Sequence, residues 1–156
     1  MIVDETTLAE LASALSAVLL PGDVIALSGD LGAGKTTFTR AVLRGLGWAG
    51  EVPSPSFTLV QTYPTEPPVW HVDLYRLGSA DEVDGLGLDE AWDVAVAIIE
   101  WPERMGDGLP ADTLRLRLDR AGDATRTLTW AVPPSWEGRW PPPDPLPPLP
   151  PQSQHR

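Results

Sequence analysis

The sequence contains no cysteine and only one lysine among its 156 residues. The lack of cysteine excludes disulfide bonds, thiolate metal sites and a cysteine nucleophile. Long hydrophobic runs are also missing, because runs such as VAVAII at 94–99 fall far short of the roughly 18 residues that cross a bilayer. The N-terminal MIVDETT is acidic, whereas a secretory signal peptide begins with basic residues. We therefore expect a soluble, cytoplasmic protein.

Positive charge is scarce as well. The formal net charge is −11 and the sequence pI is about 4.4. The average field therefore repels the phosphodiester backbone and anionic lipid, and we expect any contact with nucleic acid to run through a partner. A compact anion such as a nucleotide can still bind where amide dipoles and one or two cations overcome this background.

The spacing of apolar residues predicts one domain in which helices alternate with strands. The segment at 94–100 is apolar up to its last residue and predicts a central strand, and the PTEPP sequence at 64–68 predicts a hairpin connection. We expect Thr6 or Thr7 to cap the first helix. The predicted helices are 6–20 and 35–47, with broken helical turns at 79–92, and the predicted strands are 24–28, 57–63, 69–75, 94–100, 113–119 and 125–132.

The domain is expected to cover residues 1–132, and the composition changes after it. Residues 133–156 contain ten prolines and almost no periodic apolar face. We interpret this segment as a proline-rich, largely disordered tail. Trp136 and Trp140 are the exceptions, because each is large enough to anchor the start of the tail and to extend local order to about residue 140.

The single lysine stands in GDLGAGKT at 29–36, which satisfies the G-x-x-x-x-G-K-[ST] pattern directly after an apolar strand and before a helix. Gly32 and Gly34 let successive N–H groups point at a phosphate. Lys35 would reach the β- and γ-phosphates, and Thr36 would offer its hydroxyl to Mg²⁺. A glycine-rich turn with a surface lysine is the alternative, but the flanking strand and helix disfavour it. The fold expected is α/β and P-loop NTPase-like, in three layers with a mixed, partly antiparallel sheet.

Two carboxylates are candidates for magnesium binding or catalysis beside this loop. Glu100 ends the apolar run, where it would emerge next to Thr36 and complete the magnesium shell, unless it is an ordinary strand-end charge. Strand alternation in HVDLYR places His71, Asp73 and Tyr75 on one face, so that two groups able to hydrogen-bond flank Asp73. Asp73 is thus a candidate to orient water, while His71 alone is more often structural.

Three further positions stay open at this stage. Arg76 is either a charge-stabilising cation or a member of a surface ion pair. In SPSFT at 54–58, Ser56 or Thr58 could sense the γ-phosphate, or the segment is a plain turn. Trp101 is either a partner-facing aromatic or a core residue at a strand end.

Four segments in series resemble the TsaE (YjeE) family of small bacterial P-loop ATPases, which are required for N6-threonylcarbamoyladenosine (t6A) in tRNA. They are GDLGAGKTT, SPSFTLV, HVDLYRL and IEWPER, and the resemblance spans about residues 4–132. The first segment is shared by many NTPases, whereas the other three in series are close to diagnostic.

The resemblance implies roles for individual residues. It implies that Thr36 and Glu100 bind Mg²⁺ and that activity depends on Asp73. Glu5 and Arg126 are weakly aligned candidates for contact with adenine. Ser56 stands where threonine is common in the family and keeps the hydroxyl. The implied ATP-binding loop is Gly32, Ala33, Gly34, Lys35, Thr36 and Thr37, and the implied catalytic set is Asp73, Lys35 and Glu100.

The resemblance also implies a partner, the TsaD–TsaB heterodimer, which performs the threonylcarbamoyl transfer. ATP hydrolysis by this chain, weak alone, would reset that complex between turnovers. Two alternatives remain, a small-molecule P-loop kinase and a nucleotide-dependent binding module without significant hydrolysis. No cluster of arginines typical of a kinase lid occurs between 76 and 104. A GTPase is disfavoured, because the N-K-x-D motif needs a second lysine.

Overall fold

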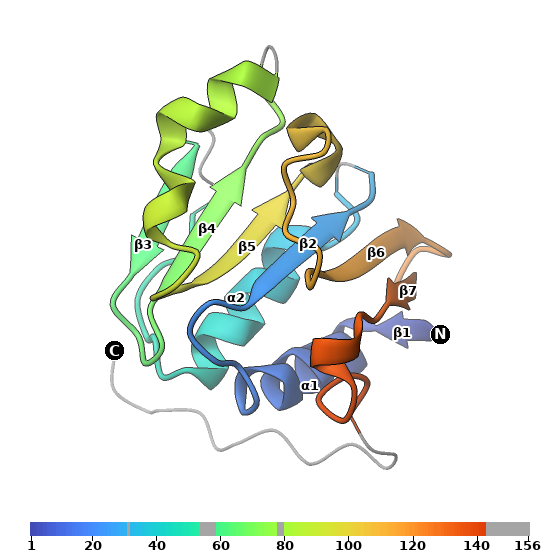
Figure 1. Cartoon of the computed structure of the whole chain (residues 1–156). Helices are drawn as coiled ribbons and strands as arrows, with labels where there is room; N and C mark the ends of the chain where they lie inside the picture. The colour runs from blue at the N-terminus through green and yellow to red at the C-terminus, as the bar shows by residue number, and fades with distance from the viewer. Residues whose placement is uncertain (31, 54–58, 78–79, 143–156) are drawn as a thin grey trace.

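A mixed sheet of seven strands forms the centre of the fold (Figure 1). The computed structural model describes residues 1–30, 32–53, 59–77 and 80–142. Strands β4, β5, β2 and β6 run parallel to one another, while β3, β7 and β1 each pair antiparallel with their neighbour. The order across the sheet is β1-β7-β6-β2-β5-β4-β3. The strands are β1 (Ile2–Asp4), β2 (Val24–Ser28), β3 (Val60–Tyr63), β4 (Val69–Asp73), β5 (Val96–Glu100), β6 (Leu114–Arg120) and β7 (Thr125–Ala131).

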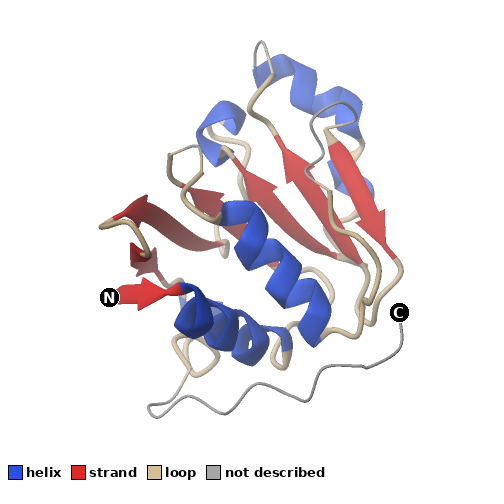
Figure 2. Ribbon diagram, turned by 180° about the vertical axis from the view of Figure 1, so that it is seen from behind, coloured by secondary structure: helices blue, strands red, loops and turns tan. Residues whose placement is uncertain are grey.

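Two α-helices lie side by side on one face of this sheet (Figure 2). They are α1 (Glu5–Ser16) and α2 (Lys35–Gly45). Their apolar sides bury Leu11 and Phe38 in one core cluster with Leu27 of β2. Short 3₁₀ helices cover the other face, where Leu74 and Ile99 are buried in a second cluster. These are η1 (Ala80–Leu86), η2 (Leu88–Glu90) and η3 (Pro102–Met105), and together the layers confirm the predicted three-layer α/β fold.

The central and hairpin strands agree with the sequence pattern. All of β5 is buried, as the apolar run predicted. The β3–β4 hairpin forms across the proline-rich connection. On β6, exposed Arg115 and Arg117 alternate with buried leucines, which confirms an antiparallel β6–β7 pair with one exposed face.

The start of the chain differs from the expectation. Asp4 caps α1, because its Oδ1 accepts a hydrogen bond from the Thr7 backbone N–H at 2.7 Å. The expected cap at Thr6 or Thr7 was therefore wrong, and both lie inside the first turn. The helix also ends at Ser16, before the predicted residue 20. Strand β1 was missed because three residues are too few for alternation to be recognised.

The described part of the proline-rich segment, 133–142, packs on the domain. It contains η4 (Pro134–Trp136), and the side chains of Trp136 and Trp140 are 0% and 2% exposed in the same core cluster as α1 and α2. Both residues that the sequence singled out as anchors are thus buried. No helix among the described residues is long and apolar enough to span a membrane.

Candidate functional site

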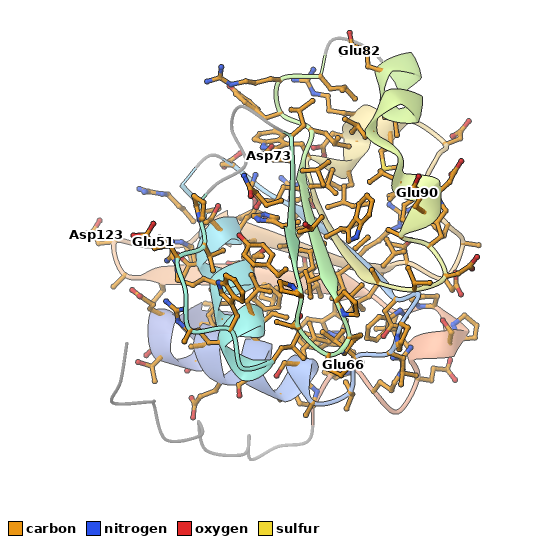
Figure 3. The ribbon with its side chains drawn as sticks, turned by 90° about the vertical axis from the view of Figure 1, so that its left-hand side faces the viewer. Glu51, Glu66, Asp73, Glu82, Glu90 and Asp123 are labelled. Atoms are coloured by element: carbon orange, nitrogen blue, oxygen red, sulfur yellow. The ribbon has the colours of Figure 1, made fainter. Side chains whose placement is uncertain are left out.

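Three parallel strands bring the candidate residues to one edge of the sheet. Leu27 of β2 pairs in register with Glu100 of β5, and Glu100 pairs with Asp73 of β4. The loop at 29–34 begins two residues after Leu27 and leads directly into α2. Figure 3 shows Asp73 at one end of β4, with Glu66 at the opposite end of its hairpin. Carboxyl ends of parallel strands are the usual place for ligands in such sheets.

The loop depends on glycine at two described positions. Gly29 has φ 135°, and a Cβ there would lie 1.8 Å from the Leu118 carbonyl oxygen. Gly34 has φ 105° and occupies the position just before α2, whose first turn carries no acidic side chain. This backbone leaves the N-terminal N–H groups of α2 available to an anion.

Lys35 is buried at the junction of loop and helix, with 5% of its surface exposed. Its Nζ donates a hydrogen bond to the Gly29 carbonyl oxygen at 2.7 Å and lies 3.8 Å from the centre of the Trp101 ring. Burial lowers the pKa of Lys35, and the negative charges of Glu100 and Asp73 oppose this shift. A desolvated cation held by one carbonyl and one ring has hydrogen-bonding capacity left for an anionic ligand.

Glu100 is also buried, and its Oε2 lies 2.5 Å from Nε2 of His71. The other ring nitrogen of His71, Nδ1, has no hydrogen-bond partner among the described residues. We expected His71 and Tyr75 to flank Asp73 with hydrogen-bonding groups. That was wrong for the histidine ring, which bonds to Glu100 on the neighbouring strand instead.

Asp73 ends β4 and is half-buried. Its Oδ1 accepts a hydrogen bond from the Tyr75 backbone N–H at 2.9 Å. Burial raises the pKa of the Asp73 carboxyl, the Tyr75 N–H opposes the shift, and the nearby Glu100 charge adds to it. Asp73 is therefore a partly desolvated carboxylate beside a second carboxylate.

The ring of Trp101 lies over Lys35. Trp101 follows β5 in a left-handed backbone conformation, with φ 59°. Its half-buried ring contacts the ring of Tyr75, with centres 4.8 Å apart. Trp101 thus packs over Lys35 at the site. Its sequence position had left open whether it faces a partner or belongs to the core, and the half-buried ring does not match either alternative completely. Tyr75 lies beyond the end of β4 and contributes its backbone N–H and its ring to the site.

Of the two candidates for contact with a base, Arg126 lies against the loop. Its Nε donates a hydrogen bond to the Ala33 carbonyl oxygen at 2.9 Å. Glu5 is exposed at the first position of α1. It follows Asp4 of β1, which pairs with Thr125 of β7, so that Glu5 begins α1 beside the strand that carries Arg126.

Arg120 is a cation at the loop that the sequence analysis missed. A Cβ added at Gly32 would lie 3.5 Å from its Nη2. Arg120 pairs in register with Arg126 across the β6–β7 hairpin. The signal was present, since a hairpin turn centred on Asp123 places residues 120 and 126 opposite each other.

The remaining predicted residues are Ser56, Arg76, Thr36 and Thr37. Ser56 and the whole segment 54–58 lie outside the described residues. Arg76 is exposed. Thr36 and Thr37 are half-buried in the first turn of α2, next to Lys35. The described part of the chain holds no group of three or more histidine, aspartate or glutamate side chains suited to a metal ion.

The family model of the threonylcarbamoyl adenosine biosynthesis protein TsaE matches residues 2–128. The chain belongs to the TsaE family. The TsaE protein of Streptomyces coelicolor is 47% identical over 116 residues, which cover 72% of this chain and 78% of that protein. The TsaE protein of Bacillus subtilis is 42% identical over 124 residues, covering 78% and 77%. The crystal structure of YdiB from Bacillus subtilis superposes with a TM-score of 0.75 at 35% identity, covering 89% of this chain and 90% of that one. The family places the chain in the biosynthesis of t6A in tRNA.

Proposed function

We propose that this TsaE-family protein binds ATP with Mg²⁺ at residues 29–37 and hydrolyses it during t6A synthesis. The position of Lys35 is the observation that carries the proposal. Its buried ammonium group stands at the N-terminus of α2, close to the charges of Glu100 and Asp73, and keeps hydrogen-bonding capacity. A phosphate bound there would accept hydrogen bonds from the N–H groups of the loop and would also interact with the charge of Lys35.

The residues present fit a magnesium ion. Thr36 and Glu100 offer a hydroxyl and a carboxylate, the hard oxygen donors that Mg²⁺ takes in phosphate sites. Burial and the Glu100 charge raise the pKa of Asp73, so this edge of the sheet carries negative charge that a divalent cation would compensate. Bound magnesium would neutralise charge on the phosphate oxygens. Thr36 and Glu100 would hold it.

Asp73 would act on the attacking water. Its carboxylate is held by the Tyr75 N–H, which fixes its direction, while partial burial makes it a better proton acceptor than an exposed aspartate. Lys35 would hold the γ-phosphate, which is separated from ADP by hydrolysis. Trp101, whose ring lies over the Lys35 ammonium group, would limit the access of water to the lysine.

The proposed partner is the TsaD–TsaB heterodimer, which ATP hydrolysis would reset between turnovers. A net charge of −11 supports an indirect relation to tRNA, since this chain would repel the RNA backbone. Family membership in t6A biosynthesis supports the choice of partner.

The test is ATP hydrolysis measured with and without the heterodimer, with nucleosides and small acids as control acceptors. We expect weak hydrolysis by the chain alone and stimulation by the partner. Lys35→Ala should remove the activity in both conditions. A phosphorylated acceptor would instead identify a kinase, and no hydrolysis in the presence of the partner would contradict the proposal.

A further inference from the structure

We infer that His71 is a positioning residue that orients the Glu100 carboxylate toward the metal ion bound with ATP. The inference rests on the proposed function and deepens it. It assigns to the histidine of HVDLYR a task that its place in the strand did not reveal. His71 itself would touch neither the nucleotide nor the metal.

The geometry joins two neighbouring strands. His71 lies within β4, where it pairs with Ile98, and Glu100 lies two residues further along β5. The His71 side chain is 0% exposed and that of Glu100 is 4% exposed, with Nε2 and Oε2 2.5 Å apart. The bond therefore fixes one carboxylate oxygen inside the sheet. The register of β5 with β2 places Glu100 opposite Leu27, at the edge of the sheet from which the loop leads to Thr36.

The unpartnered Nδ1 argues for this task over a purely structural one. A buried histidine retained for stability is expected to have both ring nitrogens satisfied. Here Nδ1 is buried and lacks a partner among the described residues. Nδ1 has no acceptor among the described residues, so the tautomer with its proton on Nε2 is the one that donates a hydrogen bond to Glu100. Carboxylates that hold metals are themselves commonly oriented by such outer hydrogen bonds.

The experiment compares His71→Gln with His71→Leu. The glutamine amide can donate a hydrogen bond from about the position of Nε2, whereas leucine preserves volume and donates nothing. The binding of a fluorescent ATP analogue is titrated with Mg²⁺ and repeated in EDTA. We expect His71→Leu to weaken the apparent Mg²⁺ affinity by about tenfold or more, and His71→Gln to stay within about threefold of the unmodified protein. In EDTA all three proteins should bind the analogue alike, because Lys35 is unchanged.

Two controls separate the possible failures. Tyr63→Phe removes another buried, unpartnered polar atom at the far end of the β3–β4 pair, and it should leave the Mg²⁺ dependence unchanged. Glu100→Gln should lose Mg²⁺ affinity. If Glu100→Gln has no effect, the metal assignment of the proposed function fails and this inference with it. If Glu100→Gln acts and His71→Leu does not, only the role of His71 is wrong.

Two further outcomes decide the role of the hydrogen bond. Equal losses in His71→Gln and His71→Leu would overturn it, because packing alone would then explain the effect. If His71→Leu does not fold, His71→Asn replaces it. The asparagine amide corresponds to Nδ1 and is too short to reach Oε2, so it should show the same loss of Mg²⁺ affinity. An unchanged Mg²⁺ affinity in folded His71→Asn would contradict the inference.

Discussion

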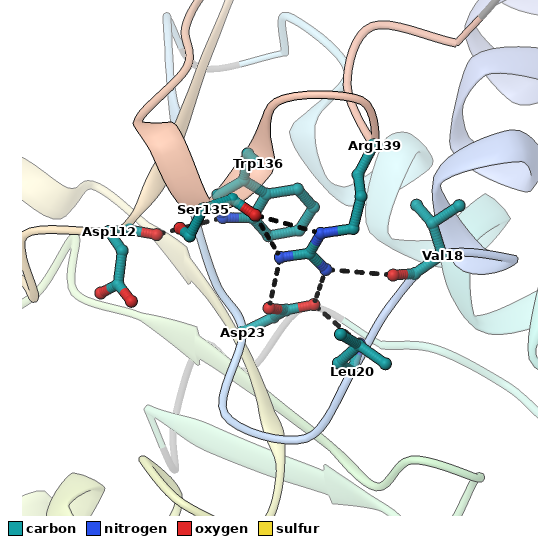
Figure 4. Close-up of polar contacts among 7 residues, drawn as sticks. All are labelled: Val18, Leu20, Asp23, Asp112, Ser135, Trp136 and Arg139. Atoms are coloured by element: carbon teal, nitrogen blue, oxygen red, sulfur yellow. Dashed lines mark hydrogen bonds and ion pairs between the residues drawn. The ribbon is translucent and has the colours of Figure 1, made fainter.

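Two hydrogen-bonded pairs of side chains lie at opposite edges of the same sheet and differ in how completely they are satisfied. At the amino edge, Asp23 precedes β2 and accepts two hydrogen bonds from Arg139, at 2.8 and 3.1 Å, and one from the Leu20 N–H (Figure 4). At the carboxyl edge, His71 bonds Glu100 through one nitrogen and leaves the other unpartnered among the described residues. The Asp23–Arg139 pair is satisfied within the fold, whereas the His71–Glu100 pair is only partly satisfied and lies beside the charges of Lys35 and Asp73.

The groups around the Asp23–Arg139 pair at the amino edge are also hydrogen-bonded within the fold. The Arg139 guanidinium lies 4.0 Å from the centre of the Trp136 ring and also donates to the Val18 carbonyl oxygen. The Trp136 Nε1 donates to the Asp112 carbonyl oxygen at 3.0 Å. The amino edge thus joins segments more than 100 residues apart by contacts between residues of this chain alone. We call residues 133–142 with Asp23 the C-terminal clamp.

The largest expected effect tests the clamp. Trp136→Ala should lower the free energy of unfolding by about 3–5 kcal/mol, because a fully buried tryptophan leaves a cavity and its N–H bond is lost. Urea denaturation measures this. ATP affinity of the folded protein should not change, since the clamp lies at the other edge. A loss of ATP affinity equal to that of loop variants would show that the two edges are coupled.

Lys35→Ala should have the opposite profile. Removing a charge-assisted phosphate contact worth about 1.5–3 kcal/mol should weaken ATP binding roughly ten- to a hundredfold. The free energy of unfolding should hardly fall. Burial of the charged ammonium group is unfavourable, and this cost offsets its one hydrogen bond to a carbonyl among the described residues. Titration calorimetry gives the affinity and urea denaturation the stability. Unchanged ATP affinity in the folded variant would sink the phosphate-loop assignment.

Asp73→Asn should stabilise the protein while it removes hydrolysis. The asparagine oxygen can still accept the Tyr75 N–H, and the desolvated charge disappears. We expect a rise in Tm of about 2 °C at pH 7, which corresponds to somewhat under 1 kcal/mol for a chain of this size. ATP affinity should stay nearly intact, because Asp73 acts on water.

The pH dependence of this gain has a definite sign. The folded pKa of Asp73 lies above its ordinary value of 3.8, so the carboxylate costs stability fully above the folded pKa. As the pH falls through the folded pKa toward 3.8, the advantage of Asp73→Asn should shrink. Urea denaturation of both proteins at several pH values checks it. An advantage that grows at lower pH would contradict the assigned shift.

The sequence predicted the parts of the site that depend on local pattern. Fewer than ten consecutive residues are enough to recognise each of three features: the G-x-x-x-x-G-K-T loop, the buried β5 run and the acid that ends this run. It could not predict the His71–Glu100 bond, because strand alternation alone places His71 beside Asp73. That bond depends on the register between β4 and β5. Arg120 was missed for a similar reason, since its approach to Gly32 depends on the pairing of a hairpin.

The clamp shows the same limit over a longer distance. The size of Trp136 and Trp140 indicated that they would anchor the segment after Pro133. Nothing in the composition indicated that Arg139 would meet Asp23, which lies 116 positions earlier. Pairings across such distances are fixed by the tertiary packing of the core, which a single sequence does not display.

The smallest expected effect belongs to the end of the chain. Residues 143–156 include six prolines and only two leucines as large apolar side chains. They offer little surface to offset the roughly 1–2 kcal/mol per residue that ordering a backbone costs. Deleting 143–156 should therefore change Tm by less than about 2 °C and leave ATP affinity and hydrolysis unaltered, as thermal melts and titration would show. Deleting from 133 removes the clamp and should cost at least as much stability as Trp136→Ala. If the shorter deletion weakened ATP binding instead, the end of the chain would belong with the carboxyl edge of the sheet, and the division between a structural and a ligand-binding edge would have to be redrawn.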